Sequence, residues 1–323
     1  MQVSSGAAAV IRAPRELQVA KIAVPTITAR QVLVRLEGCG VCASNIPVWE
    51  GKPWFSYPLE PGAPGHEGWG RIEKIGADVA EFEIGERVAM ISNRGYAEFD
   101  VADADNVVRL PPALGQDEPF PGEPLGCAVN IFRRSDIGKD DTVAIVGVGF
   151  LGALLTQLAS AAGARVIAIT RRTFALDVAR QFGAAHTIAM DDHATIVERV
   201  KDITGGSMCD VVIEATGKQW PLDLSGELTR VRGRLVVAGY HQDGPRQVNM
   251  QLWNWRGLDV VNAHERDPQV YVEGMRLAAD AVASGLLTPR PLYTHTFPLS
   301  ALGDALNMTS ERPSGFMKAL IQL

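Results

Sequence analysis

The chain has 323 residues, of which 46% are hydrophobic and 21% are charged, a globular composition with enough length for two domains. The formal net charge is -6 and the sequence holds no basic cluster, so neither nucleic acid nor an anionic membrane is expected as the main partner. No apolar run approaches the roughly 20 residues of a membrane span, and the N-terminus lacks a basic region followed by a long apolar core. We therefore expect a soluble cytoplasmic protein.

The first third of the chain predicts an antiparallel β region. Its short strands, separated by proline and polar turns, are expected at residues 7–12, 17–22 and 31–37. Cys39 and Cys42 then follow with C-x-x-C spacing, which is typical of a redox pair or of half a zinc site. The other two cysteines, Cys127 and Cys209, are too scattered for a disulfide framework. A zinc site would need further ligands from elsewhere in the chain.

The stretch TVAIVGVGFLG, residues 142–152, predicts a buried strand, a tight turn and the start of a helix. Its glycine spacing suits the pyrophosphate of a dinucleotide, with the helix N-terminus facing the anion. The residues expected to bind the pyrophosphate are Gly147, Gly149, Phe150, Leu151 and Gly152. The simpler alternative is a structural glycine-rich turn.

From Cys127 onward, strand and helix patterns alternate, which predicts a parallel sheet with helices on both faces. The second strand of this region ends in Thr170, Arg171 and Arg172 instead of an acidic residue. Guanidinium and hydroxyl groups favour a 2′-phosphate, so we expect NADP(H) in preference to NAD(H). The alternative is a solvated helix start with Thr170 as N-cap, and NAD as the cofactor.

Several motifs occur in one order along the chain: GVCAS at 40–44, GHE at 65–67, GERVA at 85–89, EPL at 123–125 and the later glycine turn. In this order they resemble the zinc-dependent medium-chain dehydrogenases, the alcohol and polyol dehydrogenase family, over nearly the whole chain. The resemblance implies an α/β protein with a Rossmann doubly wound parallel sheet and a mainly antiparallel β, GroES-like catalytic domain. Residues 1–125 and 265–323 are expected to form the catalytic domain, and 126–264 the dinucleotide-binding domain.

The resemblance also implies a catalytic zinc site. Cys42, His66 and Glu123 match the family's zinc ligands, Glu67 its second-shell or exchangeable ligand, and Ser44 the hydroxyl that carries the proton away. Thiolate, imidazole and carboxylate are all suitable zinc donors, and a bound zinc would favour the alkoxide of an alcohol. Taken singly, these residues could equally be a buried thiol, turn-forming polar groups and a surface carboxylate.

Two departures from the family pattern affect the metal. Asn45 stands where the family usually has an Asp that holds the ligand histidine, and the loss of charge is expected to weaken metal affinity. The four-cysteine lobe that binds a structural zinc in many members is missing after residues 85–89. We therefore expect at most one metal ion per chain.

The resemblance places Ala215, Thr216, Val237 and Gly239 near the ribose and nicotinamide, although they could be ordinary turn residues.

Two groups of aromatic residues lie outside these motifs, and each group has two interpretations. Trp49, Trp54, Phe55 and Tyr57 would line a substrate cleft or form a satellite hydrophobic cluster, and Trp253 and Trp255 would form a subunit interface or pack in the core. By resemblance we expect a homodimer or homotetramer.

The sequence thus predicts a zinc-dependent oxidoreductase that transfers a hydride between NADP(H) and a secondary alcohol or polyol, or its carbonyl compound. One alternative is a zinc-free reductase of activated alkenes, like the quinone-reductase branch. Another is a non-catalytic NAD(P)-binding module.

Overall fold

A computed structural model describes residues 4–323, so residues 1–3 of the predicted first domain lie outside the described part. The chain folds into two compact units. Unit 1 comprises Met1–Gly126 and Asp267–Leu323, and unit 2 comprises Cys127–Arg266. Among the described residues, no helix has the length and hydropathy needed to span a membrane.

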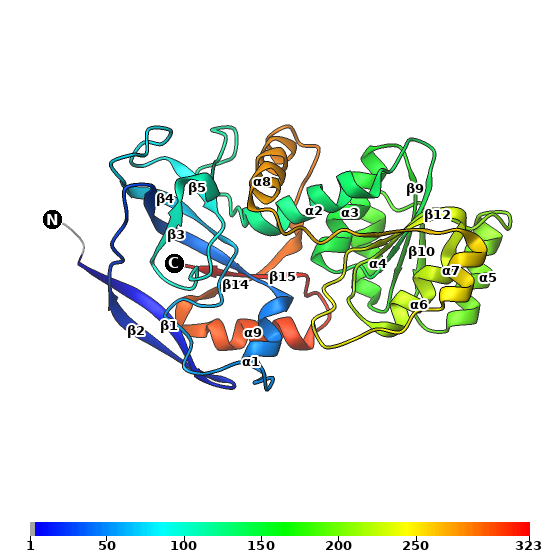
Figure 1. The fold of residues 1–323 in the computed structure, drawn as a ribbon, viewed down its shortest axis with the longest axis horizontal. Helices are drawn as coiled ribbons and strands as arrows, with labels where there is room; N and C mark the ends of the chain where they lie inside the picture. The colour runs from blue at the N-terminus through cyan, green and yellow to red at the C-terminus, as the bar shows by residue number, and fades with distance from the viewer. Residues whose placement is uncertain (1–3) are drawn as a thin grey trace. The chain divides into compact units, whose positions relative to one another are not determined.

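Unit 1 is mainly antiparallel β (Figure 1). A hairpin of β1 (Ser5–Ala13) and β2 (Glu16–Ala23) accompanies a 7-stranded sheet of order β14-β15-β3-β4-β5-β7, in which β6 also pairs with β3. The strands of this sheet are β3 (Gln31–Val41), β4 (Gly68–Ile75), β5 (Arg87–Met90), β6 (Phe99–Asp103), β7 (Val107–Arg109), β14 (Tyr293–Pro298) and β15 (Lys318–Gln322). Its helices are α1 (Ile46–Trp49), α8 (Pro268–Ala283) and α9 (Leu302–Glu311), with 3-10 turns η1 (Ala43–Asn45), η2 (Ala104–Asn106), η3 (Arg290–Leu292) and η4 (Leu299–Ala301).

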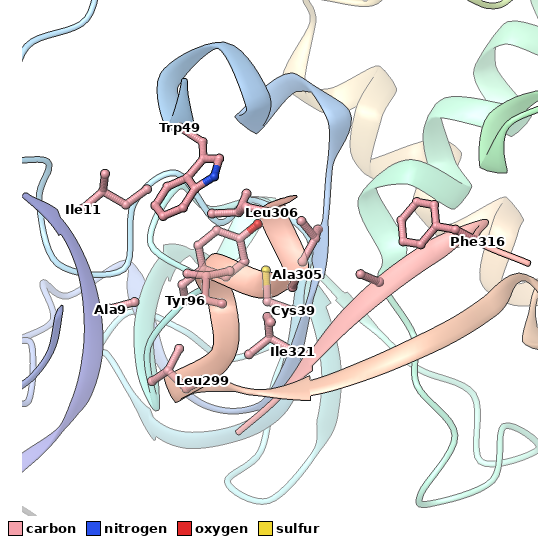
Figure 2. Close-up of a cluster of buried hydrophobic side chains, with 13 residues drawn as sticks. Ala9, Ile11, Cys39, Trp49, Tyr96, Leu299, Ala305, Leu306, Phe316 and Ile321 are labelled. Carbon is pink, nitrogen blue, oxygen red and sulfur yellow. The ribbon is translucent and has the colours of Figure 1, made fainter. Parts of the chain in front are cut away.

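A hydrophobic cluster joins β3, α1 and α9 of unit 1 (Figure 2). Cys39 is fully buried in it as a packing residue, together with Trp49 and Tyr96. Leu306 reaches the same cluster from α9. The cluster anchors the end of β3 and the turn that follows it, which is where the C-x-x-C motif ends.

Unit 2 holds a 6-stranded, fully parallel sheet of order β10-β9-β8-β11-β12-β13. Its strands are β8 (Thr142–Val146), β9 (Arg165–Thr170), β10 (His186–Ala189), β11 (Cys209–Glu214), β12 (Thr229–Val237) and β13 (Asp259–Asn262). Its helices are α3 (Phe150–Ala161), α4 (Thr173–Gln181), α5 (His193–Ile203), α6 (Gln219–Leu228) and α7 (Met250–Arg256); α2 (Gly122–Ser135) begins in unit 1 and ends in unit 2.

The side chains of β8 explain why this sheet has helices on both faces. Val143 and Ile145 pack with residues of α2 and α3, whereas Ala144 and Val146 pack with residues of α5 and α6. Both sides of the strand are buried, so its sequence is continuously apolar. The chain leaves β8 toward β9 on one side and returns through β11 on the other, which places the topological switch point between β8 and β11. The predicted fold, a doubly wound parallel sheet plus a mainly antiparallel β unit, is confirmed.

Candidate functional site

Three potential metal ligands converge in unit 1. Cys42 directly follows β3, and His66 and Glu67 directly precede β4, the antiparallel neighbour of β3. The Cys42 sulfur, a His66 ring nitrogen and a Glu67 carboxylate oxygen all lie within 4.8 Å of one another. Glu67 is fully buried, and the other two are half-buried. Thiolate, imidazole and carboxylate form a donor set that zinc accepts.

The surroundings of His66 define its tautomer and its charge. Its Nδ1 lies 2.9 Å from the carbonyl oxygen of Pro64, so Nδ1–H donates to that carbonyl, and in the neutral ring Nε2 carries the lone pair that a metal ion would use. Burial acts to lower the pKa of His66, but the negative charge and hydrogen bond of Cys42, followed by the charges of Glu123 and Glu67, raise it to about 10. This concentration of negative charge favours a bound cation.

Glu123 lies close to this group without belonging to it. It occupies the first turn of α2 and is half-buried. Its charge acts on both His66 and Lys318. The residues that the structure brings within ligand distance are therefore Cys42 and His66 together with Glu67, the residue for which the sequence predicted only a second-shell or exchangeable role.

Glu67 is held by a buried cation. Lys318 of β15 places its Nζ 2.5 Å from Oε2 and 2.6 Å from Oε1 of Glu67, and the two side chains are 6% and 0% exposed. Burial acts to lower the pKa of Lys318, but the negative charges of Glu67 and Cys42 raise it. A Cβ on Gly40 would lie 1.8 Å from Glu67 Oε2, so glycine at this position makes room for the carboxylate. Sequence analysis missed Lys318, although a lone lysine in an otherwise apolar strand is a recognisable signal.

Asn45 supports the histidine indirectly. It is 2% exposed, and its Nδ2 donates to the Pro64 carbonyl at 3.2 Å, the same oxygen that His66 uses. Its Oδ1 accepts a hydrogen bond of 2.7 Å from the hydroxyl of Tyr96, which is fully buried. Asn45 Nδ2 and His66 Nδ1 are 3.5 Å apart, and both donate to Pro64. A neutral amide, a tyrosine and a backbone carbonyl thus stand where the family usually uses a carboxylate.

The neighbouring predicted residues fall in different environments. Ser44 lies in η1 and is half-buried. Trp49 and Tyr57 belong to the hydrophobic cluster of unit 1, whereas Trp54 is 57% exposed. In unit 2, Trp253 packs partly against the core, and Trp255 on α7 is 89% exposed.

In the turn after β8, each of the three glycines is explained by a different structural requirement. Gly147 has φ +102°, and a Cβ there would lie 2.4 Å from Cγ2 of Thr216. Gly149 is the N-cap of α3, and a Cβ there would meet nothing within 4 Å, which leaves its backbone open to a ligand. A Cβ on Gly152 would lie 2.1 Å from the carbonyl oxygen of Gly147, so this glycine lets the helix approach the turn. The turn fits a pyrophosphate at a helix N-terminus.

The ends of β11 and β12 meet beside this turn. Glu214, the last residue of β11, is fully buried, and its Oε1 accepts from the backbone N–H of Thr216 at 2.7 Å and of Gly217 at 2.9 Å. The Thr216 hydroxyl donates to the same oxygen. A Cβ on Gly239, after β12, would lie 2.1 Å from the nitrogen of Gly217, so the two backbones are in contact. Of the predicted residues, Ala215 and Thr216 thus lie against Gly147, whereas Val237 and Gly239 lie beside Glu214 and Gly217 at the end of the neighbouring strand β12.

The end of β9 presents one arginine to the same turn. Arg172 is half-buried, and its Nη2 lies 3.5 Å from the carbonyl oxygen of Val148. Arg171 is exposed. Thr170 is the last residue of β9 and only 6% exposed; the N-cap of α4 is Arg172, so Thr170 does not cap this helix.

Comparison with known proteins agrees with both units. Residues 28–112 match the model of the alcohol dehydrogenase GroES-like domain, and residues 151–280 match that of the zinc-binding dehydrogenases. An alcohol dehydrogenase of Geobacillus stearothermophilus is 31% identical over 321 aligned positions, which cover 88% of this chain and 92% of that enzyme. This chain belongs to the zinc-type medium-chain dehydrogenase/reductase family. The resemblance found in the sequence motifs is confirmed.

Other relatives of this dehydrogenase act on polyols or share its fold. Sorbitol dehydrogenase of Bacillus subtilis is 24% identical over 97% of this chain and 96% of that enzyme. The crystal structure of 2R,3R-butanediol dehydrogenase from Bacillus subtilis has a TM-score of 0.85 with 20% identity, and covers 99% of this chain and 100% of that one.

Proposed function

We propose that this dehydrogenase binds one catalytic zinc ion per chain, prefers NADP(H) to NAD(H), and interconverts a secondary alcohol or polyol with its carbonyl compound. The observation that carries the proposal is the convergence of Cys42, His66 and Glu67 within 4.8 Å. The matched relatives named alcohol dehydrogenase and sorbitol dehydrogenase support the substrate class. We expect the enzyme to act as a homodimer or homotetramer.

Cys42 and His66 would hold the zinc through Sγ and Nε2. The third ligand has two candidates, Glu123 and Glu67. We assign Glu123, because Glu67 is already paired with Lys318, and we assign Glu67 the role of a carboxylate that exchanges with it. Zinc in such a site supplies a Lewis acid that favours the alkoxide of a bound alcohol.

The protein's own residues would transfer the hydroxyl proton and position the hydride acceptor. Ser44, two residues from Cys42, would take the hydroxyl proton and pass it toward solvent. A bound NADP+ would supply the hydride acceptor, so that one alcohol and one NADP+ would give one carbonyl compound, one NADPH and one proton.

In unit 2, Gly147, Gly149, Phe150, Leu151 and Gly152 would hold the pyrophosphate. Arg171 and Arg172 would bind the 2′-phosphate of NADP(H), and the position of Arg172 beside the glycine turn supports this. Thr170 would contribute less than the sequence suggested, because its side chain is buried. Ala215, Thr216, Val237 and Gly239 would border the ribose and nicotinamide.

Metal analysis of purified protein tests the zinc proposal. We expect about one zinc ion per chain, as in catalytic sites with one open position. Cys42→Ala should lose the zinc, because a three-ligand site then lacks its thiolate. Cys127→Ala, a matched removal of a half-buried thiol in unit 2, should keep it. NADPH and NADH titrated into the same samples should show tighter NADPH binding.

Each contrary result favours a named alternative. Absence of zinc from the wild type would favour a zinc-free reductase of activated alkenes. Zinc without turnover of any alcohol or polyol would favour a non-catalytic nucleotide-binding module. Tighter binding of NADH would contradict the role given to Arg171 and Arg172.

A further inference from the structure

Glu214 is the centre of a chain of contacts that the proposed zinc chemistry does not use. Its Oε1 is occupied by the donors of Thr216 and Gly217 described above. Its Oε2 lies 3.0 Å from Nε2 of His241, a residue of the loop that follows β12. The imidazole is mostly buried, with 16% of its side chain exposed. One buried carboxylate therefore holds both the loop after β11 and the loop after β12.

The second nitrogen of His241 shows which protonation state the arrangement requires. Nε of Arg246 donates to Nδ1 of His241 at 2.9 Å. An arginine Nε always carries a hydrogen, so His241 Nδ1 must be the acceptor and must lack a proton. The single N–H of the neutral ring is then on Nε2 and donates to Glu214. An imidazolium, which carries N–H on both nitrogens, cannot accept from Arg246.

Arg246 closes the arrangement between the two loops. Its Nη2 donates to the carbonyl oxygen of Gly217 at 2.8 Å and pairs with Asp243. Its Nη1 lies 3.3 Å from the carbonyl oxygens of Gly244 and Pro245 in its own loop. The guanidinium thereby ties the loop after β12 to the loop after β11.

We propose that Glu214, His241 and Arg246 form a brace that positions the nicotinamide nucleotide by fixing the ends of β11 and β12. Thr216, held by Glu214, lies against Gly147 of the glycine turn, and β8 and β11 flank the switch point of the sheet. Ligands of doubly wound sheets bind at the carboxyl ends of the strands beside that point. The brace depends on the nucleotide-binding part of the proposed function and not on the metal.

Because Arg246 donates to Nδ1 of His241, protonation of the ring would disrupt the brace and weaken nucleotide affinity. The charged groups in contact with the ring are Glu214 on β11 and Arg246 in the loop of His241 itself. One contact further out, Asp243 pairs with Arg246 and, at 2.6 Å, with Lys218 at the N-cap of α6. His264, after β13, stacks on Tyr240, the residue before His241. Protonation strengthens the attraction to Glu214, but it sets a new N–H against the Nε–H of Arg246. The guanidinium of Arg246 must then move, and the carbonyl oxygen of Gly217 loses its hydrogen bond from Nη2.

NADH binding to the full-length protein, followed by fluorescence at about pH 8 and about pH 6, tests the brace in the range where imidazoles take up a proton. NADH is the probe because the 2′-phosphate of NADPH itself titrates near pH 6. His241→Ala and Arg246→Leu should weaken binding at the higher pH at least about tenfold, since each removes hydrogen bonds to a charged group. His241→Gln offers an amide donor and an oxygen acceptor but cannot be protonated. It should bind within about threefold of wild type and lose the weakening in acid that the wild type shows.

Two imidazole variants serve as controls. His193→Gln removes a ring beside a carboxylate elsewhere in unit 2, where Nε2 lies 3.4 Å from Glu227, and should keep the wild-type affinity and pH profile. His264→Gln removes the other nearby imidazole and should keep the pH dependence.

Several results would overturn the brace. The first is a wild-type NADH affinity that does not change between the two pH values. The second is a His241→Gln variant that keeps the pH dependence, and the third is a His241→Ala variant that binds like wild type. The fourth is a wild type that binds neither NADH nor NADPH. If His241→Ala fails to fold, the pH profile of His241→Gln decides alone. A wild-type protein that holds no zinc but binds NADH would contradict the metal proposal and leave the brace standing.

Discussion

Each unit holds a completely buried glutamate, and the two glutamates are stabilised in different ways. Glu67 in unit 1 is paired with a full cation, Lys318, at 2.5 Å. Glu214 in unit 2 is surrounded by backbone N–H groups, a hydroxyl and a neutral imidazole. A buried charge is tolerated only when it is paired or hydrogen-bonded, and these are the two available solutions.

The difference follows what each site is proposed to bind. In unit 1, Lys318 balances Glu67, so the negative character that remains beside His66 comes from Cys42 and Glu123 and is available to a zinc ion. In unit 2, the donors around Glu214 point inward and fix two loops, while the glycine turn keeps its backbone open to a pyrophosphate. In unit 1 an ion pair therefore determines the charge around the candidate metal centre, whereas in unit 2 hydrogen bonds determine the conformation of two loops.

The largest effect is expected from breaking the ion pair. Lys318→Met leaves Glu67 buried without a counter-ion and should lower the free energy of unfolding by about 3–5 kcal/mol. Urea unfolding of metal-free protein measures this loss. Lys318→Arg, which keeps the charge, should lose less.

A double variant separates the ion pair from simple packing. Adding Glu67→Gln to Lys318→Met removes the orphaned charge and should restore much of the lost stability. If Lys318→Met unfolds at the wild-type urea concentration, the pair contributes nothing and the contrast between the two carboxylates disappears.

A smaller loss is expected at the hydrogen-bonded carboxylate. Glu214→Gln keeps one oxygen for Thr216 and Gly217 but sets an amide N–H2 against the Nε2–H of His241. The free energy of unfolding should fall by about 1.5–3 kcal/mol, the range for hydrogen bonds to charged groups. Thermal or urea unfolding measures it, with Glu198→Gln on the exposed face of α5 as the matched control. A loss as large as that of Lys318→Met would show that charge matters equally in both units.

The smallest effect belongs to Asp243, an acidic residue at the solvent edge of the brace. Hydrogen bonds from Lys218 and then Arg246 hold the pKa of Asp243 well below its usual value. A lowered pKa means that the ion pairs stabilise the fold above the usual Asp value of about 3.9, and that this stabilisation is lost as the pH falls through the lowered pKa. The side chain is 37% exposed, so Asp243→Asn should cost at most about 1 kcal/mol at neutral pH. Unfolding midpoints at neutral and acid pH test this, and a larger loss would make Asp243 part of the brace itself.

Local sequence patterns determined the parts of this protein that depend on neighbouring residues. The glycine spacing in 142–152 predicted the strand, turn and helix start, because each glycine answers a steric need within a few residues. The alternation of strand and helix patterns predicted the parallel sheet. The order of the motifs predicted the family.

Only the tertiary structure decided which distant side chains meet. Lys318 is 251 residues from Glu67 in the chain, and the pairing of β15 with β3 brings them together. The same is true of Tyr96 and Asn45, and of Arg246 and Gly217. These contacts depend on strand order and register, which a local pattern does not contain. For that reason the sequence predicted the types of ligand at the candidate metal centre. The structure showed that donor atoms of Glu67, Cys42 and His66 lie within 4.8 Å of one another, and that His241 links the two loops beside the glycine turn.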